Sequence, residues 1–180
     1  MHTRLPVLDS VDEGDYLAIP DFGGGISDMN VKDVSADGTI LVGTGNIKTG
    51  LRAFRADTTV VDTDLVPVPV QLVIQDAVTL QTLRSSAAEA VSEDGLIIAG
   101  RSDSPKGPVA CIWFVDDETT EWVVKSLGAL SKKNKDAVAT GIAYRSGSLV
   151  GELIVVGRSQ SILYPSEAFV WTGNPVLEEE

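Results

Sequence analysis

Few residues in this chain could carry out covalent chemistry. Its 180 residues include a single histidine, His2, and a single cysteine, Cys111. A Ser-His-Asp triad, a Cys-His pair and most zinc sites therefore lack their essential residues. Acidic residues gather in runs such as Asp116–Glu118 and Glu178–Glu180, which are typical of solvated turns and not of the facing carboxylates of glycosidases. We expect no catalytic residue, no cofactor and no metal site, so the chain is predicted not to be an enzyme.

Two segments resemble ligand-binding loops. Gly43–Gly50 (GTGNIKTG) is rich in glycine and contains Lys48, but its spacing matches neither a phosphate-binding loop nor a dinucleotide fingerprint. Asp33–Thr39 (DVSADGT) begins like a calcium loop, yet Thr44 stands where a bidentate carboxylate would complete it. Hairpin turns account for both segments, and the sequence leaves calcium binding at the Asp-Gly turns open.

The charge of the chain restricts its partners. Fourteen basic against 26 acidic residues give a formal net charge of −12, whereas nucleic acids and anionic membranes favour positive patches. No apolar stretch has the length of a membrane span, and Met1–Tyr16 lacks the apolar centre of a secretory signal. We expect neither a nucleic-acid partner nor membrane insertion, and a virion or cytoplasmic location in preference to export.

The elements that must position these residues form a threefold repeat. Each unit has an apolar run ending in glycine and, ten or eleven residues later, a second apolar run. The first runs are Thr39–Gly43, Leu96–Gly100 and Leu153–Gly157, with glycines 57 residues apart, and the second are Ala53–Ala56, Ala110–Trp113 and Ala168–Trp171. Runs so short and β-branched predict strands. One unit cannot bury its own apolar faces, so the units must stack on one another.

Further strands complete each unit. The turns VSADG and VSEDG predict type I′ hairpins that join strands at Val31–Ser35 and Ala88–Ser92 to the glycine-terminated runs. The third counterpart is Val138–Ala143, with a longer loop. Fourth strands are expected near Val68–Gln75, as an edge strand because of its prolines, and near Glu121–Leu127. Four consecutive antiparallel strands per unit predict blades of a β-propeller, at about 29–76, 86–127 and 137–172, in one domain spanning 1–180.

The third unit has no room for its own fourth strand, whereas Asp15–Phe22 resembles a fourth strand without a unit before it. Phe22 precedes the repeated Val34 by twelve residues, as Leu130 precedes Ile142. We therefore expect residues 15–22 to complete the last blade, in a neighbouring chain. Three blades are too few to close a propeller, so we expect two chains joined head to tail in a six-bladed ring. The alternatives are a trimer with nine blades and an open stack of three sheets capped by loops or by a different protein.

Two aromatic residues, Trp122 and Tyr164, lie outside the repeated positions and are our candidates for contacts with a ligand or partner. Cys111 replaces a repeated aromatic residue and is expected to be a small buried hydrophobe. The residues that we expect to define the repeat are Asp37, Gly38, Gly43, Phe54, Asp94, Gly95, Gly100, Trp113, Gly157, Phe169 and Trp171.

These motifs resemble the HAF family of bacterial extracellular repeats, whose units read approximately AVSADGSVVVG, AFRWT and LGTLGG. The matching segments are Val34–Gly38, Val42–Gly43, Arg52–Arg55, Val91–Gly95, Gly100–Ser102, Leu127–Leu130 and Ala168–Gly173. The resemblance extends from Tyr16 to Gly173. It implies a propeller-like β-repeat, and no catalytic residues come with it.

Two functions are compatible with these features of the sequence. The first is a non-catalytic structural or protein-interaction component, such as part of a virion or surface appendage, whose partners are further copies of itself and other structural proteins. The alternative is a glycan-binding propeller. Such a lectin should repeat its binding residues in every unit, but the loops NIKTG, SDSPKG and SQSILYPS share almost nothing.

Overall fold

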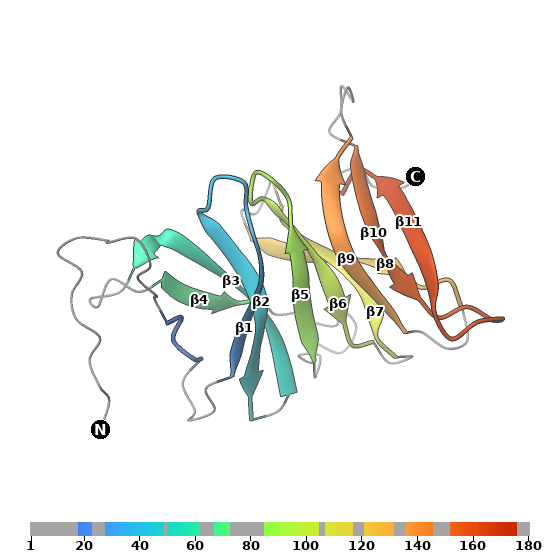
Figure 1. Cartoon of the computed structure of the whole chain (residues 1–180), viewed down its shortest axis with the longest axis horizontal. Helices are drawn as coiled ribbons and strands as arrows, with labels where there is room; N and C mark the ends of the chain where they lie inside the picture. Colours follow the sequence, from blue (N-terminus) through green and yellow to red (C-terminus); the bar gives the residue numbers. More distant parts are fainter. Residues whose placement is uncertain are drawn as a thin grey trace.

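The computed structural model describes residues 18–22, 28–48, 50–61, 67–72, 85–104, 107–116, 121–131, 136–145 and 152–175. Within these ranges the protein is all-β and contains no helix. Eleven strands form three antiparallel sheets that follow one another along the chain, side by side (Figure 1).

Each sheet corresponds to one predicted unit. Sheet 1 contains β1 (Met29–Val34), β2 (Ile40–Ile47), β3 (Gly50–Val61) and β4 (Pro67–Gln71). Sheet 2 contains β5 (Ser86–Val91), β6 (Ile97–Ser102), β7 (Val109–Val115) and β8 (Trp122–Gly128). Sheet 3 contains β9 (Ala137–Tyr144), β10 (Leu153–Ser159) and β11 (Glu167–Gly173). The strands predicted within the three units are thus confirmed, including the proline-containing edge strand β4, and among the described strands no sheet closes on itself.

The turns that begin the first two hairpins differ in type from the prediction. The amide of Gly38 donates to the carbonyl oxygen of Ser35 at 2.9 Å, so Ala36 and Asp37 are the central residues of this turn. Gly38 follows them with a φ of 75°, and Gly95 has the same role in sheet 2 with a φ of 74°. A four-residue turn ending in a left-handed glycine is typical of type I geometry followed by a glycine bulge. The expected type I′ turn is wrong because the Asp-Gly pair is shifted by one position.

The three repeated glycines are required by a bulge in the first strand of each sheet. Lys32, Glu89 and Thr140 are extra residues in β1, β5 and β9, opposite β2, β6 and β10. At each bulge a carbonyl oxygen of the first strand lies directly over the glycine of the second, so that any Cβ there would overlap it. The pairs are Asn30 with Gly43, Ala87 with Gly100 and Val138 with Gly157. This steric constraint explains a spacing that the sequence showed without its cause.

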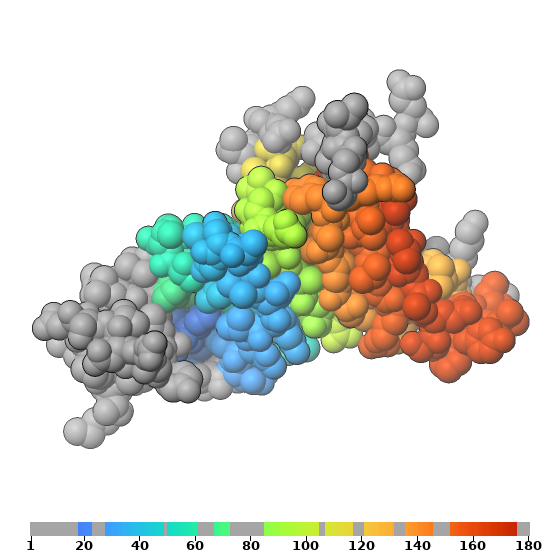
Figure 2. Space-filling model, turned by 45° about the horizontal axis from the view of Figure 1, so that its top comes forward, coloured from blue at the N-terminus to red at the C-terminus, as the bar shows by residue number. Residues whose placement is uncertain are grey.

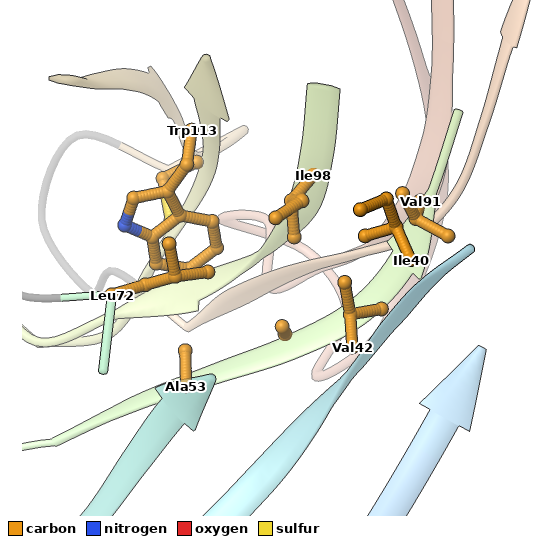
Figure 3. Close-up of a cluster of buried hydrophobic side chains, with 9 residues drawn as sticks. Ile40, Val42, Ala53, Leu72, Val91, Ile98 and Trp113 are labelled. Carbon is orange, nitrogen blue, oxygen red and sulfur yellow. The ribbon is translucent and has the colours of Figure 1, made fainter. Parts of the chain in front are cut away.

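The sheets pack through two opposite faces. We call the face of each sheet that points to the next sheet along the chain its front face, and the opposite face its back face. Between sheets 1 and 2, the front-face residues Ile40, Val42 and Ala53 lie against the back-face residues Val91, Ile98 and Trp113 (Figure 3). Between sheets 2 and 3 the same arrangement recurs. Ile97, Ala99, Ala110 and Ile112 are the front-face residues there, against Ala139, Leu153 and Val155.

The aromatic strand of the third sheet differs from those of the other two. Phe54 and Trp113 are fully buried, whereas Phe169 and Trp171 are half-buried. The reason is the edge of the sheet: β4 pairs with β3 and β8 with β7, but within the described ranges no strand pairs with the outer edge of β11. Residues 18–22 form no strand, and 15–17 lie outside the described residues. Phe22 lies against Phe54 of sheet 1, with ring centroids 6.2 Å apart.

We predict that Gly100→Ala is far more destabilising than Gly38→Ala. The added methyl would overlap the Ala87 carbonyl oxygen in the first case, and the backbone of a buried strand cannot move away. The expected loss is about 3 kcal/mol or more for the overpacked site. At Gly38 nothing lies within 4 Å and only the left-handed φ is strained, which costs about 1–2 kcal/mol. Urea unfolding of both variants measures the difference, and equal losses would refute the steric explanation.

Candidate functional site

The front face of sheet 3 is an apolar surface that none of the other described sheets covers. Val156 is 42% exposed and Val170 is 68% exposed, and these two residues are directly paired across β10 and β11. Ala168 beside them is exposed and Ile154 is half-buried. The register of the repeat shows what this surface is. The residues at the same positions of sheet 2 (Ile97, Ala99, Ala110 and Ile112) are at most 6% exposed and form its contact with sheet 3.

The back face of sheet 1, at the other end of the stack, also carries exposed apolar residues. Val31 is 44% exposed, Val34 is 47% exposed, and Leu41 is half-buried. Their equivalents Ala88, Val91 and Ile98 are at most 6% exposed in the contact between sheets 1 and 2. In sheet 3 the equivalents Ala139 and Val155 are fully buried and Ile142 packs beside them. The two ends of the stack therefore present exposed apolar residues on the front face of sheet 3 and on the β1–β2 part of the back face of sheet 1, whereas Phe54 and Ala56 of β3 on that back face are fully buried.

Phe22 lies on sheet 1 at the position where, on sheet 3, the chain arrives from the preceding sheet. It lies over Gly45 and beside Phe54, on the back face of sheet 1. Leu130, its predicted counterpart, occupies the same place on sheet 3, where its amide donates to the Ser159 hydroxyl at 3.0 Å. Ser159 corresponds to Gly45 in the repeat. Residue 22 thus relates to sheet 1 as the segment after β8 relates to sheet 3.

A pocket of about 140 Å³ lies beside β11. It is lined by Phe169, Val170 and Trp171, by Ser159, and by Leu127–Leu130, which includes the last two residues of β8 and the two that follow. In sheets 1 and 2 the fourth strand covers the equivalent aromatic strand. For example, Val124 of β8 is paired with Trp113. The pocket therefore lies where side chains of a fourth strand would pack.

A second, polar cleft of about 240 Å³ lies between sheets 1 and 2. Two of the bulge residues, Lys32 and Glu89, line it together with Arg101 and with Asp28, Asn30, Thr44, Leu51 and Ala87. Within the described part of the chain, Lys32, Glu89 and Arg101 make no ion pair. The cleft can contact polar groups of either charge, but these lining residues include no nucleophile with an adjacent base and no aromatic platform for a sugar ring.

The structure places the two predicted contact residues differently. Trp122 is half-buried at the start of β8 and packs against the core between sheets 1 and 2. The guanidinium of Arg55 lies 5.3 Å from its ring centroid, so one face of the indole is engaged by a cation–π contact. Tyr164 is 57% exposed in the loop between β10 and β11. The two side chains therefore belong to different regions and do not form one site.

The predicted turn residues Asp37 and Asp94 accept hydrogen bonds from residues of their own turns. The pKa of Asp37 is lowered by hydrogen bonds from the Ser35 hydroxyl and from the amide and hydroxyl of Thr39. Burial raises the pKa of Asp94, but hydrogen bonds from Ser92, Leu96 and Tyr144 outweigh it and lower the value. Among the residues described, no group of three or more histidine, cysteine or acidic side chains could hold a metal ion. The carboxylates of Asp37 and Asp94 therefore hold the shape of their turns through these hydrogen bonds.

Cys111 lies in the core, 1% exposed and paired with Gly100, as expected for a small hydrophobe. Burial raises the pKa of its thiol well above the ordinary value, which keeps it protonated and unreactive. The described ranges also contain no helix that could cross a membrane.

Hydrogen bonds join neighbouring sheets at the turn end. Asp33 of sheet 1 accepts from the Val91 amide at 3.0 Å, and the Ala36 amide donates to the carbonyl oxygen of Glu93 at 3.0 Å. Between sheets 2 and 3, the Tyr144 hydroxyl donates to Asp94 at 2.8 Å. These bonds fix the orientation of one sheet on the next.

Neither a family model, nor a curated protein, nor a solved structure matches this chain. The candidate site is therefore identified from the exposure and the strand register of this protein alone.

The exposed faces were not among the predicted site residues. Val31, Val34, Val156 and Val170 have the alternation of ordinary strands, and composition does not distinguish an end sheet from a middle one. The signal was present in the repeat register, because Val31, Val34 and Val156 align with apolar residues in both other units and Val170 aligns with Ile112 of sheet 2.

We predict that the contribution of Tyr144 to the stability of the protein decreases at alkaline pH. Burial and the hydrogen bond to Asp94 raise the pKa of Tyr144 to about 12. A tyrosine in the unfolded chain has a pKa of about 10. At a pH between this value and the pKa in the folded protein, the hydroxyl loses its proton in the unfolded state but keeps it in the folded state. Stability is complete below the unfolded pKa and falls as the pH rises toward the folded one. Chemical unfolding of wild type and Tyr144→Phe from pH 7 to 11.5 measures this. The stability advantage of the wild type should shrink above pH 10, and a pH-independent difference would contradict the assignment.

Proposed function

We propose that this protein is a non-catalytic β-propeller-type scaffold that acts by assembling with further copies of itself. The observation that carries the proposal is the pair of exposed apolar surfaces at the two ends of the stack. On the front face of sheet 3, Val156 and Val170 occupy the positions of the buried Ala99 and Ile112 of sheet 2. On the back face of sheet 1, Val31 and Val34 occupy the positions of the buried Ala88 and Val91. A front face fits a back face, so the association is head to tail.

In this proposal two copies form a ring of six sheets. Three sheets cannot close around an axis, whereas four to eight blades are typical of propellers. The residues upstream of Phe22 would continue along β11 of the second copy and supply the missing fourth strand of its third sheet. The pocket beside Phe169 and Trp171 supports this step, because it lies at the position of fourth-strand side chains. Pairing the β11 edge would also remove an open site for aggregation.

The proposed class is a structural or protein-interaction component, in agreement with the resemblance to HAF-type repeats. A virion or surface appendage would use such a ring as a building block. Enzymatic activity is not part of the proposal, because the described clefts offer no catalytic arrangement. The second candidate is glycan binding, which the polar cleft between sheets 1 and 2 favours through its charged and amide side chains.

The test is the native mass of the protein. We predict that sedimentation equilibrium at micromolar concentration gives twice the 19.0 kDa of one chain. The variant Val170→Asp should raise the dissociation constant by about a hundredfold or more, because an unpaired carboxylate would be buried between two apolar faces.

The matched control is Leu96→Asp, which introduces the same charge at an exposed leucine in the β5–β6 turn. This variant should assemble as the wild type does, and circular dichroism should show that both variants are folded. A wild-type protein that remains a 19.0 kDa monomer across the concentration range would refute the proposal.

A further inference from the structure

The loop between β10 and β11 carries three adjacent exposed hydrophobic residues. Ile162 is 82% exposed, Leu163 is 81% exposed and Tyr164 is 57% exposed. We call this segment, Ile162–Tyr164, the apolar tip. The corresponding loops of sheets 1 and 2 are polar, with the sequences NIKTG and SDSPKG. Large apolar groups gathered at one exposed point of a protein usually mark an interaction surface.

The apolar tip has a defined backbone shape. The Ser161 hydroxyl accepts from the amides of Leu163 and Tyr164 at 3.2 and 3.0 Å. The Ser161 amide donates in turn to the carbonyl oxygen of Tyr164 at 3.0 Å. These bonds close a compact turn, so binding would cost less conformational entropy than the ordering of a flexible loop.

The direction of the loop points to a partner beyond sheet 3. The β10–β11 loop projects on the side of sheet 3 that faces away from sheet 2 (Figures 1 and 2). This is the side of the uncovered front face, where a fourth sheet would continue the stack. A partner that binds to the front face of sheet 3 would therefore also contact the apolar tip.

The repeat shows which residues this loop should meet. At the contact between sheets 2 and 3, the loop before β7 touches the start of β9: the Pro108 carbonyl oxygen accepts from the Ala137 amide at 3.2 Å. Ala137 is paired with Ser159, and the equivalent residue of sheet 1 is Met29, which is paired with Gly45. The loop of sheet 3 should therefore reach Met29 in the sheet that follows it.

Met29 belongs to an apolar surface that suits the tip. Its sulfur and the ring of Phe22 both lie over Gly45, and both side chains are half-buried. From these observations we propose that the apolar tip of one copy docks on the Phe22–Met29 surface of a second copy and anchors the head-to-tail contact. This inference rests on the proposed function, whose interface it extends. Contacts within a chain are assisted by the covalent connection, whereas a contact between chains requires additional apolar area.

The test compares two dissociation constants, measured by sedimentation equilibrium on the full chain. Ile162→Ser combined with Leu163→Ser should weaken dimerisation by about tenfold or more, as expected for exposed apolar anchors that become buried on binding. Leu96→Ser is the control, because it makes the same change at an exposed leucine far from the contact. It should leave the dissociation constant unchanged, and circular dichroism should give the same spectrum for all variants.

A double-mutant cycle identifies the docking partner. If Leu163 of one copy contacts Met29 of the other, Leu163→Ser and Met29→Ala should each weaken the dimer, and the double variant should be weaker by less than the product of the two effects. A wild-type dimer that is unaffected by the tip variants would overturn this inference and leave the proposed function standing. Independent effects of Leu163→Ser and Met29→Ala would overturn the assignment of Phe22–Met29. A monomeric wild type would overturn both proposals.

Discussion

Every sheet of this protein has two apolar faces, and each face is stable only when another element shields its side chains from water. In sheet 2 the requirement is met on both sides, where Ile97 and Ala99 face sheet 3 and Ile98 faces sheet 1. Burial of such side chains is the main favourable contribution to folding. The end sheets satisfy the requirement on one side only, which leaves Val34 at one end and Val170 at the other exposed to solvent. These exposed residues are therefore the surfaces through which we propose that further copies of the chain bind.

The geometry of the sheets follows from the bulge that is repeated in their first strands. The extra residue places a carbonyl oxygen over a glycine of the second strand, which brings the two backbones close together. It also turns Lys32 and Glu89 toward the polar cleft between the first two sheets. The same local feature thus fixes the repeated glycines, the shape of the sheets and the lining of the cleft.

The strands and their grouping could be predicted because apolar runs, Asp-Gly turns and the 57-residue spacing are properties of local sequence. The turn type was wrong, since a one-residue shift of the Asp-Gly pair changes the hydrogen-bond pattern without changing the composition. The half-buried state of Trp171 follows from the lack of a fourth strand in the described part of sheet 3, which the length of the third unit predicted. The exposed faces were missed because Val156 and Ala99 have similar local sequence, and only the order of the sheets separates them.

The most direct test of head-to-tail closure is the mass of a mixture of two disabled variants. Val170→Asp changes the front face of sheet 3, and Val34→Asp changes the back face of sheet 1. If the contact is head to tail, each variant alone is monomeric, whereas an equimolar mixture forms heterodimers through the one contact in which both faces are intact. Sedimentation velocity with one variant fluorescently labelled would detect them. A mixture that remains monomeric, while the wild type dimerises, would contradict head-to-tail closure.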